Sequence, residues 1–112
     1  MMKIWIDDVR TAPAGYVWCK STLNALHTIY HNADDIVEIN LDHDAGEYAF
    51  EGGDFINVLK ELERLCHSPN ALKRAYWLEH CINYRFVLHS ANSVGIQNMR
   101  AIIQANGWKE IM

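Results

Sequence analysis

The sequence predicts an α/β domain built on an open, mostly parallel sheet of four or five strands. Two observations favour this class. Short apolar segments alternate along the chain with amphipathic segments of helical period. Three of the apolar segments stop abruptly in acidic or imidazole side chains, as strands do when their carboxyl ends open onto a ligand site. With 112 residues, the chain is expected to form a single domain over residues 1–112.

The first strand is predicted over residues 2–6, which are mostly apolar, as in a strand buried on both faces. Pro13 and Gly15 then mark a turn in which no helical period fits. A second short strand is expected over residues 16–19. Because a parallel connection normally needs a dozen or more residues, this strand either pairs antiparallel with the first, or begins later and lies at an edge of the sheet.

Two amphipathic helices are predicted in the first half of the chain. The first extends from a cap at Ser21 or Thr22 to about Asn32, and its apolar stripe is Leu23, Leu26, Ile29 and Tyr30. The central strand, residues 36–41, follows it. The second helix, capped by Asp54, has the most regular apolar pattern in the chain, made of Phe55, Ile56, Val58, Leu59, Leu62 and Leu65.

The second half of the chain continues the alternation of strands and helices. A shorter helix is expected between residues 67 and 83, with a poorer apolar stripe of Leu72, Ala75, Tyr76, Leu78 and Ile82. A buried strand follows at residues 84–88, and then a helix at about residues 94–106. Residues 108–112 form either a last short strand or a tail packed by Trp108.

Composition and charge argue against several classes of function. The formal net charge of −4 disfavours sequence-independent coating of duplex DNA, which depends on Lys and Arg. No run approaches the roughly 18 apolar residues of a membrane span, and no basic leader precedes the first strand, so a cytoplasmic protein without a membrane partner is expected. The three cysteines show no C-x-x-C spacing, so neither a disulfide framework nor a zinc finger is indicated.

The strongest functional signal is the polar ends of the predicted strands. The central strand ends in the Asp-His-Asp of residues 42–44, which cannot be buried unpaired because desolvating an ionised carboxylate costs several kcal/mol. The first strand ends in Asp7 and Asp8, and a later strand ends in the His-Ser-Ala-Asn of residues 89–92. Because the carboxyl ends of parallel strands share one edge of a sheet, these groups predict one site.

The residue types at these strand ends indicate phosphate chemistry assisted by a metal. Asp7, Asp8 and Asp42 are candidate ligands of a divalent metal, Mg²⁺ or Mn²⁺, since converging carboxylates repel one another without a cation. The alternative for the first pair is a solvated strand end that caps a turn. His43 and His89 are candidate general base and acid in phosphodiester hydrolysis. The alternative for His43 is a hydrogen bond to a backbone carbonyl, and the alternative for His89 is a satisfied histidine at a strand end.

Four further polar residues are candidates for binding a phosphate or substrate. Ser90 and Asn92 precede a predicted helix, whose free N-terminal amides attract anions. Arg10 can bind a phosphate bidentately, and Asp44 can orient a histidine or act as a ligand. The alternatives stay open, because Asn92 can simply cap the helix and Arg10 can form an ordinary salt bridge.

Taken together, these motifs resemble a known family. The acidic strand ends and the Ser90-Ala91 pair resemble the receiver domains of two-component response regulators. The fuller set is Ile-Asp-Asp-Val-Arg at residues 6–10, Leu-Asp-His-Asp at residues 41–44 and His-Ser-Ala-Asn at residues 89–92. This set resembles the cyclic-phosphate-processing receiver-like family, an offshoot of receivers that is associated with nucleotide signalling and phage–host conflict.

The resemblance implies a compact, receiver-like (flavodoxin-like) three-layer sandwich, here with the helix after the first strand missing. It implies a metal-assisted phosphoesterase, with Asp42 among the catalytic groups, acting on a cyclic phosphate of a small nucleotide or an RNA end. The alternative is a non-catalytic module that accepts phosphate on Asp42 or sequesters a phosphorylated ligand. Receivers carry a lysine after the fifth strand, and Lys109 matches it poorly, which argues against phosphorelay.

Overall fold

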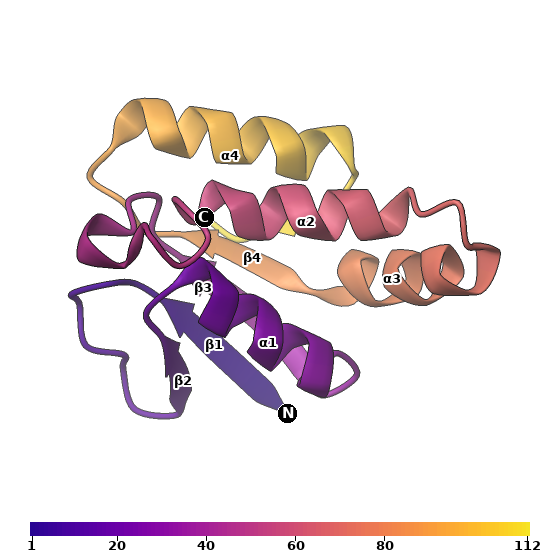
Figure 1. Cartoon of the computed structure of the whole chain (residues 1–112), viewed down its shortest axis with the longest axis horizontal. Coiled ribbons are helices and arrows are strands. Elements are labelled where there is room, and N and C mark those ends of the chain that lie inside the picture. Colours follow the sequence, from indigo (N-terminus) through magenta and orange to yellow (C-terminus); the bar gives the residue numbers. More distant parts are fainter.

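The computed structural model describes residues 1–112 and contains a five-stranded, fully parallel sheet in the order β2-β1-β3-β4-β5 (Figure 1). The strands are β1 (Met2–Ile6), β2 (Tyr16–Cys19), β3 (Ile36–Leu41), β4 (Arg85–Leu88) and β5 (Lys109–Glu110). The helices are α1 (Thr22–Asn32), α2 (Ile56–Cys66), α3 (Ala71–Asn83) and α4 (Ser93–Ala105), with a short 3₁₀ turn η1 (Gly46–Tyr48). The predicted α/β class is confirmed, and the connection from β1 to β2 contains no helix.

Strands β1 and β2 are parallel neighbours although only residues 7–15 connect them. Their register pairs Lys3 with Tyr16 and Ile6 with Cys19. The connection from Ile6 to Tyr16 must therefore run back by only three residue positions, about 10 Å, to the level of Lys3. An extended chain of that length spans roughly 30 Å, which is ample. Of the two alternatives, antiparallel pairing is therefore wrong. The edge position of the second alternative is correct, but the strand begins at Tyr16 and not later.

All four helices lie on the same side of the sheet. One buried apolar cluster contains strand residues from this face, Ile4, Ile6, Ile39, Leu41 and Phe86, together with inner residues of every helix, among them Ile29, Leu62, Trp77 and Met99. From β2 to β5 the chain always moves across the sheet in one direction, and right-handed connections then place each helix on one side. The domain therefore has two layers, not the three of the expected sandwich. The helix-free β1–β2 connection, which moves the other way, adds no layer on the opposite face.

The buried sides of α1 and α3 differ from the predicted apolar stripes. In α1, which Ser21 caps, Ala25 and Ile29 are buried, whereas two residues of the expected stripe, Leu23 and Tyr30, are exposed. In α3 the buried side chains are Trp77 and Cys81, and the exposed ones include Leu72, Tyr76, Leu78 and Ile82. Because α3 packs mainly against α2 rather than on the sheet, a narrow stripe with one large indole is enough to fill its contact.

The segment after β3 also differs in detail from the prediction. Helix α2 has Phe55 at its N-cap, and the Asp54 carboxylate instead accepts a hydrogen bond from the backbone N–H of Ala45 at 3.0 Å. This bond ties the loop after β3 to the start of α2. At the other end of the chain, Trp108 stacks on Phe86 with 5.1 Å between ring centroids and leads into β5. None of the helices combines the length and apolar character that a membrane crossing demands.

Candidate functional site

The carboxyl ends of β1 and β3 bring three carboxylates together. Oxygen atoms of Asp7, Asp8 and Asp42 lie within 4.8 Å of one another. Asp7 and Asp42 are buried, Asp8 is partly buried, and no Lys or Arg forms an ion pair with any of them. Groups that are 35 residues apart in the sequence therefore share one acidic cluster, as parallel strands with adjacent ends require.

Asp7 is the most constrained of the three and is fully buried. Its Oδ1 accepts the backbone N–H groups of Val9 at 3.0 Å and Arg10 at 2.9 Å, and its Oδ2 accepts Nε2 of His89 at 2.8 Å. This carboxylate therefore fixes the first turn of the β1–β2 connection and orients His89.

His89 is held in one orientation on the face of the sheet that carries no helices. Its ring stacks on the Trp5 indole, with 3.8 Å between centroids and 9° between planes, and its Nδ1 faces the side-chain amide oxygen of Asn40. Burial lowers the pKa of His89 and outweighs the opposite influence of the Asp7 carboxylate. The sequence analysis did not single out Trp5 or Asn40. Each lies two positions before a site aspartate, and this spacing was the available signal.

The lowered pKa of His89 predicts reduced stability in mild acid. An unfolded histidine has a pKa of about 6.5, whereas the folded protein keeps His89 neutral to a lower pH. As the pH falls through 6.5, the unfolded chain binds a proton that the folded chain does not, so the free energy of unfolding decreases. Urea denaturation at pH 7.5 and pH 5.5 in buffer with a chelator measures this decrease. It should be smaller in His89→Gln, and equal decreases in the two proteins would contradict the assignment.

Asp8 and Asp42 complete the acidic cluster. The pKa of Asp8 is raised mainly by burial and further by the neighbouring negative charges of Asp7, Asp42 and Asp44. Asp42 accepts the backbone N–H of His43 at 2.7 Å. The backbone of Gly46, with a φ of +53°, lies so close that a β-carbon there would be 2.2 Å from Oδ2 of Asp8. The fold therefore holds like charges near one another, an arrangement that a divalent cation would stabilise.

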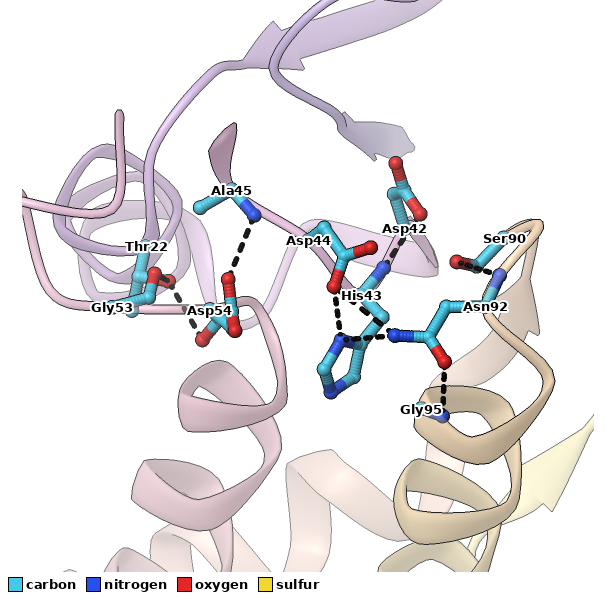
Figure 2. A network of polar contacts seen from close by, with 10 residues as sticks. All are labelled: Thr22, Asp42, His43, Asp44, Ala45, Gly53, Asp54, Ser90, Asn92 and Gly95. Atoms are coloured by element: carbon cyan, nitrogen blue, oxygen red, sulfur yellow. Dashed lines mark hydrogen bonds and ion pairs between the residues drawn. The ribbon is translucent and has the colours of Figure 1, made fainter. Parts of the chain in front are cut away.

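A second polar group lies at the start of α4 (Figure 2). His43 Nδ1 is 2.7 Å from Oδ1 of Asp44, and the Asn92 side-chain amide is 3.2 Å from the same oxygen. The hydrogen bond from His43 holds the pKa of Asp44 below its usual range. Ligand atoms of His43, Asp44 and Asp54 also lie within 4.8 Å of one another, and Asn92 caps α4 by accepting the N–H of Gly95 at 2.9 Å.

The two predicted catalytic histidines do not face each other. Figure 2 shows the ring of His43 pointing away from the Asp42 carboxylate and toward the start of α4. A β-carbon at Gly95 would lie 2.4 Å from this ring, so the glycine allows the helix to approach it. His89 contacts Trp5 and the acidic cluster instead. The structure therefore joins His89, but not the ring of His43, to the three carboxylates.

The candidate phosphate-binding residues are divided between these two groups. The Arg10 guanidinium is exposed and donates to the backbone oxygen of His89 at 3.4 Å. Ser90 Oγ accepts the N–H of Asn92 at 3.1 Å, within the turn that leads into α4. Lys109 pairs in register with Arg85 at the amino end of β4. It therefore lies at the opposite end of the strands from the acidic edge. The poor match to the receiver lysine is consistent with this position.

The acidic cluster lies at an open edge and not in a deep cavity. The molecule has three cavities of about 360 to 410 Å³, and none is lined by the three aspartates or by His89. A ligand at this edge would keep much of its surface outside the protein. Binding there depends on charge and hydrogen bonds more than on enclosure.

A parallel α/β sheet with strand order 2-1-3-4-5 and an acidic cluster at the ends of β1 and β3 defines a receiver-like domain. The chain belongs to the family described as the cyclic-phosphate processing receiver domain, which it matches over residues 2–105. The match extends from β1 to the end of α4. Comparisons with curated proteins and with solved structures gave no match.

Proposed function

We propose that the protein is a metal-assisted phosphoesterase that hydrolyses a cyclic phosphate on a nucleotide or an RNA end. The main support is the meeting of three carboxylates with a histidine fixed by one of them, at the carboxyl edge of a domain from a cyclic-phosphate-processing family. A cyclic phosphodiester carries one negative charge. Its approach to an acidic edge is favourable only if a cation offsets the carboxylates.

Asp8 and Asp42 are the metal ligands in this proposal. Their oxygens lie close together without a basic partner, and carboxylate oxygens are the donors that Mg²⁺ and Mn²⁺ prefer. Asp7 belongs to the same cluster, but its two oxygens already accept three hydrogen bonds, so we assign it the positioning of His89. When bound, the cation would polarise a phosphoryl oxygen and lower the pKa of an attacking water.

His89 is the general acid–base group in this proposal. Its lowered pKa keeps it neutral near pH 7, so only one ring nitrogen carries a proton, although both face acceptor oxygens, Oδ2 of Asp7 and Oδ1 of Asn40. The nitrogen without the proton is therefore the atom that can exchange one. It would take a proton from water as the oxygen bonds to phosphorus, and return it to the ester oxygen that leaves as the ring opens. The product is a phosphomonoester.

The exposed polar groups around the acidic cluster would hold the phosphate. Arg10 supplies an exposed cation beside the backbone of His89. Ser90 lies in the turn before α4, whose N-terminal amides favour an anion. His43, Asp44 and Asn92 are hydrogen-bonded to one another at the same helix, and we assign them the positioning of this turn.

The test is hydrolysis of a panel of 2′,3′- and 3′,5′-cyclic nucleotides with Mg²⁺ or Mn²⁺, followed by chromatography of the phosphomonoester. We expect activity that EDTA removes and that Asp42→Asn abolishes. His89→Asn should lower kcat by about 10²- to 10⁴-fold. The matched control is His80→Asn, a half-buried histidine on α3 whose Nδ1 faces the backbone oxygen of Tyr76 and whose ring lies beside Tyr76, and it should keep full activity.

Two outcomes would count against the proposal. A wild-type protein that is inert on the whole panel, including an oligonucleotide ending in a 2′,3′-cyclic phosphate, would exclude the hydrolase. Equal activity in wild type and both site variants would assign the turnover to a contaminant. Tight nucleotide binding without turnover would support the sequestering alternative, and a phosphate mass on Asp42 after acetyl phosphate treatment would support a phosphoacceptor.

A further inference from the structure

The face of the sheet without helices carries a row of cations. The strand register places Tyr16, Lys3, Glu38, Arg85 and Lys109 side by side across all five strands. The three basic side chains are exposed, and none of them forms an ion pair. The single acid of the row, Glu38, accepts a hydrogen bond from the Tyr16 hydroxyl. A chain with a net charge of −4 thus presents a locally basic surface.

A less polar row lies between these cations and the acidic edge. Two positions further along the strands, the register brings Trp5, Asn40 and Val87 together, and Ile111 continues the row beyond β5. Trp5 stands edge-on to Tyr16, with 5.9 Å between ring centroids, and stacks on His89 at the other end. Aromatic and apolar side chains on an open sheet are a surface against which nucleic-acid bases pack.

The spacing of the rows suits a short stretch of nucleic-acid strand. Four positions separate Lys3 from Asp7 and Arg85 from His89, which corresponds to about 13 Å along the strands. That length covers roughly four nucleotides stacked at 3.4 Å per base, and fewer in an extended strand. No helix covers this face of the sheet, so a chain can continue from the phosphate toward the cations.

We infer that the helix-free face binds a single-stranded oligonucleotide whose terminal cyclic phosphate reaches the acidic edge. Upstream phosphates lie on the cationic row, and a base packs beside Trp5. The inference rests on the proposed function and specifies an RNA end as its preferred substrate over a free cyclic nucleotide, which would occupy the acidic edge alone. A second copy of the chain fits poorly, because face-to-face packing would set the same unpaired cations, Lys3, Arg85 and Lys109, against each other.

The test is fluorescence polarisation with a labelled single-stranded RNA of ten nucleotides that ends in a 3′-hydroxyl, in buffer with EDTA. Wild type should bind it. The variant Arg85→Gln/Lys109→Gln should bind at least about tenfold more weakly, and the slope of log K against log salt should fall by about 1.4. The control Lys60→Gln/Lys73→Gln removes the same charge from exposed positions on α2 and α3 and should bind like wild type.

Absence of binding by wild type, or equal weakening in the two double variants, would overturn the inference. Displacement of the RNA by polyglutamate of equal charge would also overturn it and indicate an acidic protein partner. Hydrolysis of free cyclic nucleotides by wild type tests the proposed function separately, because a single nucleotide at the acidic edge is too short to reach the cationic row about 13 Å away. RNA binding without any hydrolysis would contradict the proposed function but not the binding surface. Hydrolysis without RNA binding would contradict only this inference.

Discussion

Replacing Asp7 with alanine should lower the free energy of unfolding by about 2–3 kcal/mol. The side chain is fully buried and accepts hydrogen bonds from two backbone N–H groups and from His89. Alanine leaves these donors without their acceptor inside the protein. Asp7→Asn should cost less, because the amide oxygen can still accept the N–H groups of Val9 and Arg10 while its NH₂ faces the ring of His89.

Urea denaturation at pH 7.5 in the presence of a chelator gives this difference without any contribution from a metal. The matched control is Asp34→Ala, an exposed aspartate before β3, which should change stability by no more than about 0.5 kcal/mol. If Asp7→Ala is no less stable than the control, the carboxylate does not organise the first turn after β1.

Gly46→Ala should reduce the hydrolytic activity by about 10²-fold, because a β-carbon would be placed 2.2 Å from Oδ2 of Asp8. No contact of that length is tolerated, so either the carboxylate or the loop after β3 must move. Alanine is also strained at the φ of +53° that Gly46 adopts. The variant therefore combines a backbone cost with displacement of a proposed metal ligand.

Gly15→Ala separates these two effects. Gly15 has a φ of +86°, but a β-carbon there meets nothing within 4 Å. It should therefore lose stability by about 1 kcal/mol from backbone strain and keep its activity. Steady-state hydrolysis, with folding checked by circular dichroism, compares the two variants. Equal loss of activity in both would show that backbone strain, and not the position of Asp8, limits the reaction.

Local patterns in the sequence predicted the bounds of the strands better than the number of helix and sheet layers in the domain. The bounds of β1, β2 and β3 agree with the prediction, because apolar runs there stop at Pro, Gly or charged residues. The side of α3 that is buried was missed, since it depends on packing against α2 and not on the helical period alone. The number of layers depends on the direction of each connection, which no single segment encodes.

The candidate site also has features that the sequence predicted and features that only the folded chain shows. The meeting of Asp7, Asp8, Asp42 and His89 follows from strands whose carboxyl ends are adjacent. The separation of His43 from this cluster follows from the alternation of side chains along an extended chain, which sends residues 42 and 43 to opposite sides. The close approaches at Gly46 and Gly95 involve segments far apart in sequence, so only the folded chain shows why glycine stands there.

The short connection between β1 and β2 also has a kinetic consequence. Lys3 and its partner Tyr16 are 13 positions apart, whereas Glu38 and its partner Arg85 are 47 positions apart. In the unfolded polypeptide, closing the longer loop costs about 1 kcal/mol more in chain entropy. The N-terminal pair is thus the contact between strands that the unfolded chain samples most readily. Assembly of the sheet can begin at this edge before the segments of the later strands are in place.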